Sequence, residues 1–487
     1  MQRILWLTIL MSLIIFNSVF AKTNIIWEKK YNQFNDGKGE SIVETSDGGF
    51  VLSGTYCDNQ TDEYKHFLIH TDSAGNILWN KEFWVYTHHW DCNVQLTFDG
   101  GYIVCGGGTD GRLIKFDESG NIIWNKSYGD EGYQFGRYGI QTSDSGYAYT
   151  GSYGSESQPN NKIWLVKTDS NGEVQWTKMY GEFDLVGVGT SVIQTADMGY
   201  LISAHTWFEG ENNENFVLTR TDLEGNIIWS KKYGPEDYRC RPEHTITTKD
   251  NGYITVGKAQ DSKTEVSFVH IVKTNSSGDT LWTRMFQRDA WSWGHSIQEL
   301  SDGGYIVAAR TAKKFIMKWG YKNPDEIDAW IFKLNQDGEI EWEQILGGPY
   351  NDEILFIHQN SDDSFVFTGS YGIAEYNSEL WFVKLSAEGD LSADIKIAQP
   401  MEFHLMQNFP NPFNPTTTIR YSLNKSNNVL LKIHNIAGQH LETLVNGFQS
   451  AGEHEIIWQS NGLPSGIYFY TLRTGNFSQT KKLILQK

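Results

Sequence analysis

Short hydrophobic stretches separated by glycine-containing turns recur along most of this chain. In residues 39–82 the stretches are four or five residues long and rich in β-branched and aromatic residues. They are Ser41–Thr45, Phe50–Gly54, Phe67–His70 and Ile77–Lys81. Asp47-Gly48-Gly49 separates the first two and Asp72–Asn76 the last two, and both segments have the composition of tight turns. The pattern predicts four antiparallel strands and no helix.

The same unit recurs seven times, marked by an Asp-Gly turn that leads into an aromatic residue. The turn aspartates are Asp47, Asp99, Asp144, Asp197, Asp250, Asp302 and Asp362. A second motif, in which tryptophan follows a Gly-containing turn, gives Trp79, Trp124, Trp176, Trp229, Trp282 and Trp342. The seventh unit lacks this tryptophan after Gly389, whereas Trp27 precedes the first unit. A closed ring accounts for both facts if the strand around Trp27 is the outermost strand of the last unit. We therefore predict an all-β fold: a seven-bladed β-propeller closed by the N-terminal strand.

The motif Asp-x-x-Gly-x-x-x-Trp has a structural interpretation. Its Asp can accept hydrogen bonds from the following backbone, its Gly can adopt a positive φ, and its Trp can pack between blades. The motif resembles the tryptophan-docking repeat of quinoprotein-like propellers, which usually have eight blades. This resemblance implies architecture only. We predict no cofactor, because no quinone- or calcium-ligand set is present; a calcium role for the Asp and Asn turns is the alternative, but each turn offers too few oxygen ligands.

Composition and charge divide the 487 residues further. Residues 1–21 have the basic, apolar and small-residue order of a signal peptide. We assign 22–386 to the propeller, 387–407 to a linker and 408–487 to a small Ig-like β-sandwich. The net charge is −19, about +3 from residue 400 onward and −22 before it. The acidic body argues against nucleic acid as a partner, and no transmembrane segment is predicted in the mature chain.

The tail contains several ordered motifs. They are Asn408, Pro410, Asn411 and Pro412 at its start, Gly438, then Pro464, Gly466 and Tyr468, and finally Lys481 and Lys482. These motifs closely resemble the type A C-terminal sorting domain of the type IX secretion system, which overlaps with the FlgD-like immunoglobulin family. The resemblance implies that the type IX machinery is a partner, and that the protein is secreted or located on the outer-membrane surface. A plain β-sandwich spacer is the alternative.

The irregular loops opposite the Asp-Gly turns are where we expect a binding site. Aromatic residues with interspersed His and Arg suit a sugar or an extended peptide. The candidate ligand-binding residues are His88, His89, Trp90, Tyr133, Arg137, Tyr138, Trp207, Arg239, Trp291, Trp293 and His295. Packing between blades is the alternative role for each aromatic residue. We predict no metal site, because His88 and His89 are adjacent on a strand and would point to opposite faces.

The blade-to-blade loops also contain candidate catalytic carboxylates: Asp130, Glu131, Asp184, Asp237, Glu243, Asp289, Asp352 and Glu353. Acidic residues in nearly every blade are equally typical of a solvated rim, so no catalytic residue is assigned. We predict a surface or secreted protein that binds an extracellular glycan, peptide or protein. The alternatives are a polysaccharide-acting glycosidase or lyase and a structural envelope protein. The four cysteines are either small buried side chains or include a Cys92–Cys105 pair.

Overall fold

The computed structural model describes residues 24–58, 63–83, 92–106, 110–129, 132–155, 158–181, 185–208, 214–318, 321–374, 377–386, 404–408, 410–423, 427–449, 452–460, 462–475 and 477–486. The predicted signal peptide and most of the predicted linker lie outside these residues. The chain divides into two units, Met1–Ser392 and Ala393–Lys487. Within the described ranges, no helix is long and apolar enough to cross a membrane.

The described part of the first unit forms seven four-stranded antiparallel sheets, which we call blades one to seven. Blade one has β2 (Lys38–Glu44), β3 (Phe50–Asp58), β4 (Glu63–Thr71) and β5 (Ile77–Phe83); blade two has β6 (Cys92–Leu96), β7 (Tyr102–Gly106), β8 (Gly111–Phe116) and β9 (Ile122–Tyr128). Blade three has β10 (Gly132–Gln141), β11 (Tyr147–Ser155), β12 (Gln158–Thr168) and β13 (Val174–Tyr180); blade four has β14 (Leu185–Gln194), β15 (Tyr200–Phe208), β16 (Asn215–Thr221) and β17 (Ile227–Tyr233). Blade five has β18 (Tyr238–Thr247), β19 (Tyr253–Asp261), β20 (Ser267–Thr274) and β21 (Thr280–Phe286); blade six has β22 (Trp291–Glu299), β23 (Tyr305–Lys318), β24 (Tyr321–Leu334) and β25 (Ile340–Leu346). Blade seven has β26 (Glu353–Gln359), β27 (Phe365–Ala374), β28 (Asn377–Leu385) and β1 (Ile25–Asn35).

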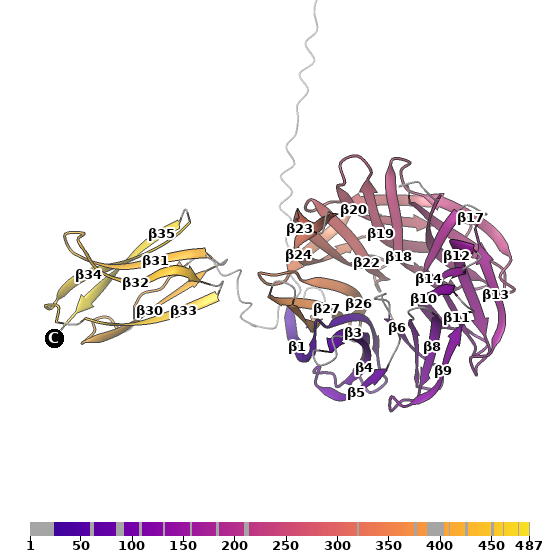
Figure 1. Cartoon of the computed structure of the whole chain (residues 1–487), viewed down its shortest axis with the longest axis horizontal. Helices are drawn as coiled ribbons and strands as arrows, with labels where there is room; N and C mark the ends of the chain where they lie inside the picture. Colours follow the sequence, from indigo (N-terminus) through magenta and orange to yellow (C-terminus); the bar gives the residue numbers. More distant parts are fainter. Residues whose placement is uncertain are drawn as a thin grey trace, which may run out of the picture. The chain divides into compact units, whose positions relative to one another are not determined.

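The propeller prediction is confirmed, including its closing strand. Strand β1 pairs antiparallel with β28, with Trp27 opposite Lys384. Next to this pair, the Ser386 N–H donates to the Asn24 carbonyl at 2.8 Å, so both ends of the ring meet in one sheet. Figure 1 shows the first strands of blades two to seven around the centre of the ring.

Neighbouring blades are joined by the tryptophans, as predicted. Trp27 packs against Gly75 so closely that a Cβ on this glycine would lie 3.0 Å from its ring, and Trp79 packs in the same way against Gly120. Both glycines have a positive φ near 75°. In the same turn, Asp72 Oδ1 accepts hydrogen bonds from the Ala74 and Asn76 N–H groups at 2.9 and 2.8 Å. The role of these residues is therefore structural: they shape the turns and hold neighbouring blades together.

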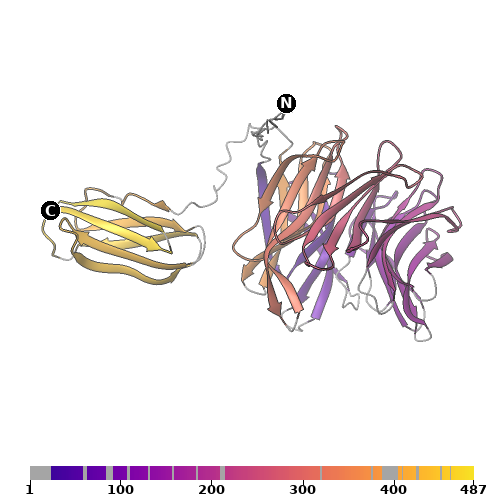
Figure 2. The same cartoon turned by 90° about the horizontal axis from the view of Figure 1, so that it is seen from above.

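The second unit is a separate β-sandwich with its own core. One sheet has the order β32-β31-β34-β35 and the other β29-β30-β33, and Figure 2 shows their strands in two layers. The strands are β29 (His404–Leu405), β30 (Thr416–Leu423), β31 (Asn427–Asn435), β32 (His440–Gln449), β33 (Gly452–Gln459), β34 (Gly466–Thr474) and β35 (Phe477–Leu485). The core includes Trp458, Tyr421 and Tyr470. Strand β29 lies inside the segment predicted to be linker and pairs with β30.

Candidate functional site

The first strand of six blades contains a β-bulge, which places one extra residue between two ladder pairs. The bulge residues are Glu40, Arg137, Thr190, Glu243, His295 and Leu355. A bulge redirects a side chain without ending the strand. Here all six bulge residues line one cavity at the centre of the ring.

A glycine directly before the bulge allows the first strand of a blade to pack closely against the preceding blade. A Cβ on Gly39 would lie 1.8 Å from Thr368 Oγ1, and one on Gly189 would lie 2.1 Å from Thr150 Oγ1. Thr368 and Thr150 belong to the second strands of the preceding blades. The backbone of the inner strand thus packs directly against the neighbouring blade, where any side chain would collide.

The cavity has a volume of about 310 Å³ and is lined by three tiers of residues. The middle tier contains the six bulge residues and Cys92, so every blade contributes one residue to it. The upper tier, two positions earlier on the strands, contains Lys38, Trp293 and Glu353. The lower tier, one position later, contains Asn93, Tyr138, His244 and Phe356. Arg310 of β23 completes the lining.

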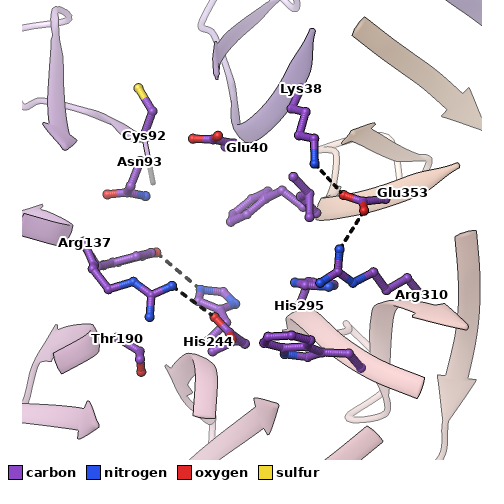
Figure 3. A pocket seen from close by; sticks show the side chains of 15 residues that line it. Lys38, Glu40, Cys92, Asn93, Arg137, Thr190, His244, His295, Arg310 and Glu353 are labelled. Atoms are coloured by element: carbon purple, nitrogen blue, oxygen red, sulfur yellow. Dashed lines mark hydrogen bonds and ion pairs between the residues drawn. The ribbon is translucent and has the colours of Figure 1, made fainter. Parts of the chain in front are cut away.

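Ion pairs fix most of the charged lining. Glu353 lies between Lys38 and Arg310, with Oε2 3.1 Å from Lys38 Nζ and Oε1 2.7 Å from the Arg310 guanidinium (Figure 3). Burial alone would raise the pKa of Glu353, but Lys38 and Arg310 outweigh it and hold this pKa well below its ordinary value. On another wall, Arg137 lies 3.7 Å from Glu243. The cavity therefore presents fixed charges of both signs.

In the lower tier, a hydrogen bond links blades three and five across the ring. His244 Nδ1 accepts from the Ile297 N–H at 3.3 Å, so its Nε2 carries the proton and donates to the Tyr138 hydroxyl, also at 3.3 Å. The Phe356 ring lies 5.6 Å from the His244 ring. Burial lowers the pKa of His244 to about 4 and raises that of Tyr138 to about 12, so both groups are neutral at pH 7.

Ring side chains of blade six, Trp293 and His295, form one wall of the cavity. The His295 ring stacks on Trp293 with centroids 5.5 Å apart and an interplanar angle of 20°. The Arg310 guanidinium lies 4.9 Å from the centre of the Trp293 ring. Burial and then the charge of Arg310 hold the pKa of His295 well below its ordinary value. This imidazole is therefore a neutral, polar part of the wall.

The structure brings four of the predicted ligand-binding residues together in the cavity: Arg137, Tyr138, Trp293 and His295. Trp291 instead lies buried against Ala312 and Ile327. Trp207 on β15 stacks on His205 at 5.5 Å, and Arg239 on β18 lies opposite Gln260; neither lines the cavity. His88, His89 and Trp90 lie outside the described residues, and so does the side chain of Tyr133.

Reasoning from residue type alone missed most of the lining, although a spacing rule in the sequence identifies it. Every middle-tier residue lies seven positions before the turn aspartate of its blade, as Glu40 does before Asp47 and Cys92 before Asp99. Upper-tier residues lie nine positions before that aspartate, and lower-tier residues six. Arg310 follows no such rule because it comes from a second strand.

The candidate carboxylates lie in different environments. Asp237 is exposed, and Asp130, Glu131 and Asp184 lie outside the described residues. Glu243 and Glu353 line the cavity, together with Glu40. Asp352 lies outside it, fully buried, and accepts hydrogen bonds from the Gly348 N–H at 2.6 Å and the Gly372 N–H at 2.9 Å. Burial raises its pKa to about 7. No cluster of three potential metal ligands occurs among the residues that the structure describes, and Cys92, Cys105 and Cys240 are buried side chains.

The sorting motifs occupy defined positions in the second unit. Asn408 is buried, and its N–H donates to the Tyr470 hydroxyl at 2.8 Å. Asn411 Oδ1 accepts from the Ile484 N–H at 2.8 Å, whereas Pro410 and Pro412 are exposed. The Tyr468 hydroxyl donates to the Pro464 carbonyl at 2.7 Å beside Gly466, the first residue of β34. Gly438 has a φ of 76° in the turn before β32. Lys481 and Lys482 lie on β35, close to the C-terminus.

Comparison with known proteins identifies the tail more clearly than the propeller. Solved structures similar to the chain include a protein of unknown function from Bacteroides caccae, at 11% identity, covering 60% of this chain and 93% of that one, with a TM-score of 0.37. The Pan2 WD40 domain of Neurospora crassa is 13% identical, with coverages of 71% and 89% and a TM-score of 0.43. PorZ, a surface component of the type IX secretion system of Porphyromonas gingivalis, is 9% identical, with coverages of 91% and 69% and a TM-score of 0.31. Similarity of this degree does not indicate a shared function.

A search among curated proteins finds no significant match to the chain. Residues 407–486, by contrast, match the family described as the secretion system C-terminal sorting domain. The match covers every sorting motif noted above, from Asn408 to Lys482. Residues 407–486 therefore belong to this sorting-domain family, and the chain is a β-propeller protein that the type IX system exports to the cell surface or the surrounding medium.

Proposed function

We propose that the exported propeller binds one residue of an extracellular carbohydrate in its central cavity. The observation that carries the proposal is the middle tier: all seven blades direct a residue into one cavity, and their chemistry is mixed. A purely structural ring could fill its centre with apolar side chains. Instead the lining combines three glutamates, three cations and two histidines with aromatic rings.

This mixture suits a sugar. Aromatic faces such as Trp293 can stack on the apolar face of a pyranose, while charged groups accept and donate hydrogen bonds to its hydroxyls. The Lys38–Glu353–Arg310 triad is held in place before any ligand arrives. Such preorganisation reduces the entropy lost on binding.

Cavity size limits how much ligand can enter. A volume of about 310 Å³ lies at the lower end of the range of about 300–1,000 Å³ for small-molecule sites. The Tyr138–His244 hydrogen bond spans the ring in the lower tier and would obstruct a threaded chain. The site therefore accommodates a terminal sugar, not the middle of a threaded polymer.

The test is a glycan and peptide binding screen with the full mature chain, followed by two matched variants. Trp293→Ala removes the stacking surface and should abolish or strongly weaken sugar binding. Trp207→Ala is the control, because Trp207 also stacks on a histidine but lies outside the lining. Loss of binding only in Trp207→Ala would indicate that the site lies outside the cavity. Failure of the wild-type chain to bind any sugar would contradict the proposal.

Because three glutamates line the cavity, a polysaccharide-acting enzyme is the second candidate function. Glycoside hydrolysis requires one carboxyl group with a raised pKa to act as an acid. Glu353 has the opposite property, because Lys38 and Arg310 keep it ionised. Glu40 and Glu243 remain as candidate acids. Release of reducing sugar that is lost in Glu40→Gln or Glu243→Gln would establish the enzyme.

A further inference from the structure

We propose that the sugar bound in the cavity is uncharged, and that its hydroxyl groups contact both the cation and the carboxylate of the ion pairs in the lining. The inference rests on the proposed carbohydrate function and specifies its ligand class. A terminal neutral hexose is the chemistry that we assign, in preference to a uronic acid or an amino sugar.

The first support is the charge balance of the lining. Its charged residues are the cations Lys38, Arg137 and Arg310 and the carboxylates Glu40, Glu243 and Glu353. The two histidines add no charge at pH 7, because burial lowers the pKa of His244 to about 4 and holds that of His295 well below its ordinary value. The lining is therefore electroneutral. A charged ligand would lose its hydration there without meeting a net opposite charge, which is costly for a buried ion.

The second support is that cations and carboxylates on two walls already neutralise each other. Glu353 Oε2 lies 3.1 Å from Lys38 Nζ, and its Oε1 lies 2.7 Å from the Arg310 guanidinium. Figure 3 shows Arg137 on the side of the cavity opposite Lys38 and Arg310, where it pairs with Glu243. A ligand carboxylate would have to compete with these glutamates for their cations, and a ligand ammonium would have to compete with these cations.

The third support is that a ligand in the cavity can reach both members of each pair. All four residues of the Lys38–Glu353 and Arg137–Glu243 pairs line the cavity. Their side chains are 27% and 11% exposed in the first pair and 19% and 16% in the second. Each pair thus presents a donor beside an acceptor to the ligand.

Hydroxyl groups match this arrangement better than charged groups do. A hydroxyl both donates and accepts, so one hydroxyl, or two on adjacent carbons, can accept from the cation and donate to the carboxylate of the same pair. The 3.7 Å separation of Arg137 Nη2 and Glu243 Oε2 exceeds a hydrogen bond and allows an oxygen to bridge the two groups. A carboxylate can only accept and an ammonium can only donate, so either would satisfy one member of the pair and face a like charge on the other.

A zwitterion such as a free amino acid is the other ligand compatible with an electroneutral lining. Each of its charges would compete with an ion pair that the protein already forms, whereas hydroxyls can add to the pair without breaking it. We therefore favour the neutral sugar and include amino acids in the test.

The experiment measures calorimetric affinities of the full mature chain for methyl glucoside, methyl galactoside and methyl mannoside. Each is compared with its uronic acid and its amino-sugar counterpart, and serine and phenylalanine serve as the amino acids. The wild type should bind at least one neutral hexoside about tenfold more tightly than either charged counterpart, because only the charged sugars bury an uncompensated charge. Since the ligand carries no charge, its affinity should change less than about twofold between about 0.05 and about 0.5 M sodium chloride.

Two matched variants test the role of the ion pairs. Glu243→Gln removes the carboxylate beside Arg137 and gives the lining a net positive charge, so the ratio of hexoside to uronide affinity should fall by about tenfold. Glu214→Gln is the control, because Glu214 also pairs with an arginine, Arg241, and its side chain is similarly buried at 18% exposure, but it lies outside the lining. This control should leave the ratio unchanged.

The outcomes separate the inference from the proposed function, and those on the wild type do not depend on the folding of a variant. Binding of a uronide or an amino sugar at least as tightly as every neutral hexoside would overturn the inference but leave the proposed function intact. An unchanged affinity ratio in Glu243→Gln would refute the contact with the Arg137–Glu243 pair. Binding of an amino acid but of no sugar, or of none of these ligands, would overturn both.

Discussion

Replacement of Trp27 by alanine tests whether the N-terminal strand holds the ring closed. The Trp27 ring lies 4.8 Å from Phe382 in its own blade and 6.4 Å from Phe50 in blade one. Its indole N–H donates to the Ser73 carbonyl at 3.2 Å. The side chain thus fixes blade seven to blade one, and its removal should weaken the junction at which the chain ends meet.

The magnitude follows from these contacts. Truncation of a buried Trp or Phe to alanine costs about 3–5 kcal/mol. Trp27 is only half-buried, so we expect about 3 kcal/mol, including a small contribution from the hydrogen bond at its exposed edge. For a cooperative unit of this size, that loss lowers the melting temperature by about 4 °C.

Urea unfolding and calorimetry of three variants form the assay. Ile26→Ala is the control on the same strand, because Ile26 is 43% exposed and should cost less than about 0.5 kcal/mol. Trp176→Ala removes the equivalent contact with Gly225 at an interior junction and should cost about as much as Trp27→Ala. If Trp27→Ala behaved like Ile26→Ala while Trp176→Ala destabilised the protein, ring closure by β1 would be refuted.

Two further outcomes are expected. The pKa of Asp352 is raised to about 7 by burial, so the folded state holds its proton more tightly than the unfolded state does, and stability is lost as pH rises through 7. Between pH 6.5 and 8 the free energy of unfolding of the wild type should fall by about 1 kcal/mol relative to that of Asp352→Asn, because the buried histidines contribute equally to both proteins; the same pH dependence in both proteins would mean that Asp352 does not titrate in this range. Truncation after residue 399 should prevent surface export while circular dichroism shows a folded propeller, and normal secretion of the truncated chain would contradict a sorting role for the tail.

The architecture could be predicted from sequence because its determinants are local and repeated. Asp72, Gly75 and Trp79 lie within one turn and strand, and their backbone chemistry is the same wherever the motif recurs. The position of Trp27 could be predicted for a different reason. A ring requires its missing strand to come from the other end of the chain, and β1 supplies it.

The cavity could be predicted only in part. Arg137, Tyr138, Trp293 and His295 stood out because aromatic and charged residues in irregular segments are unusual. Leu355 and Thr190 were not recognised, since their importance depends on a bulge and not on their chemistry. The Tyr138–His244 bond joins blades that are not neighbours.

The bulges have a consequence for engineering the specificity of this ring. Each bulge residue is left out of the ladder pairs that hold its strand in register, and its side chain contacts the cavity. Glu40, Arg137, Thr190, Glu243, His295 and Leu355 are therefore positions at which side chains can be exchanged while the strand pairs on either side persist. A combinatorial library confined to these six codons would vary the recognition surface without altering the turns and tryptophans that hold the blades together.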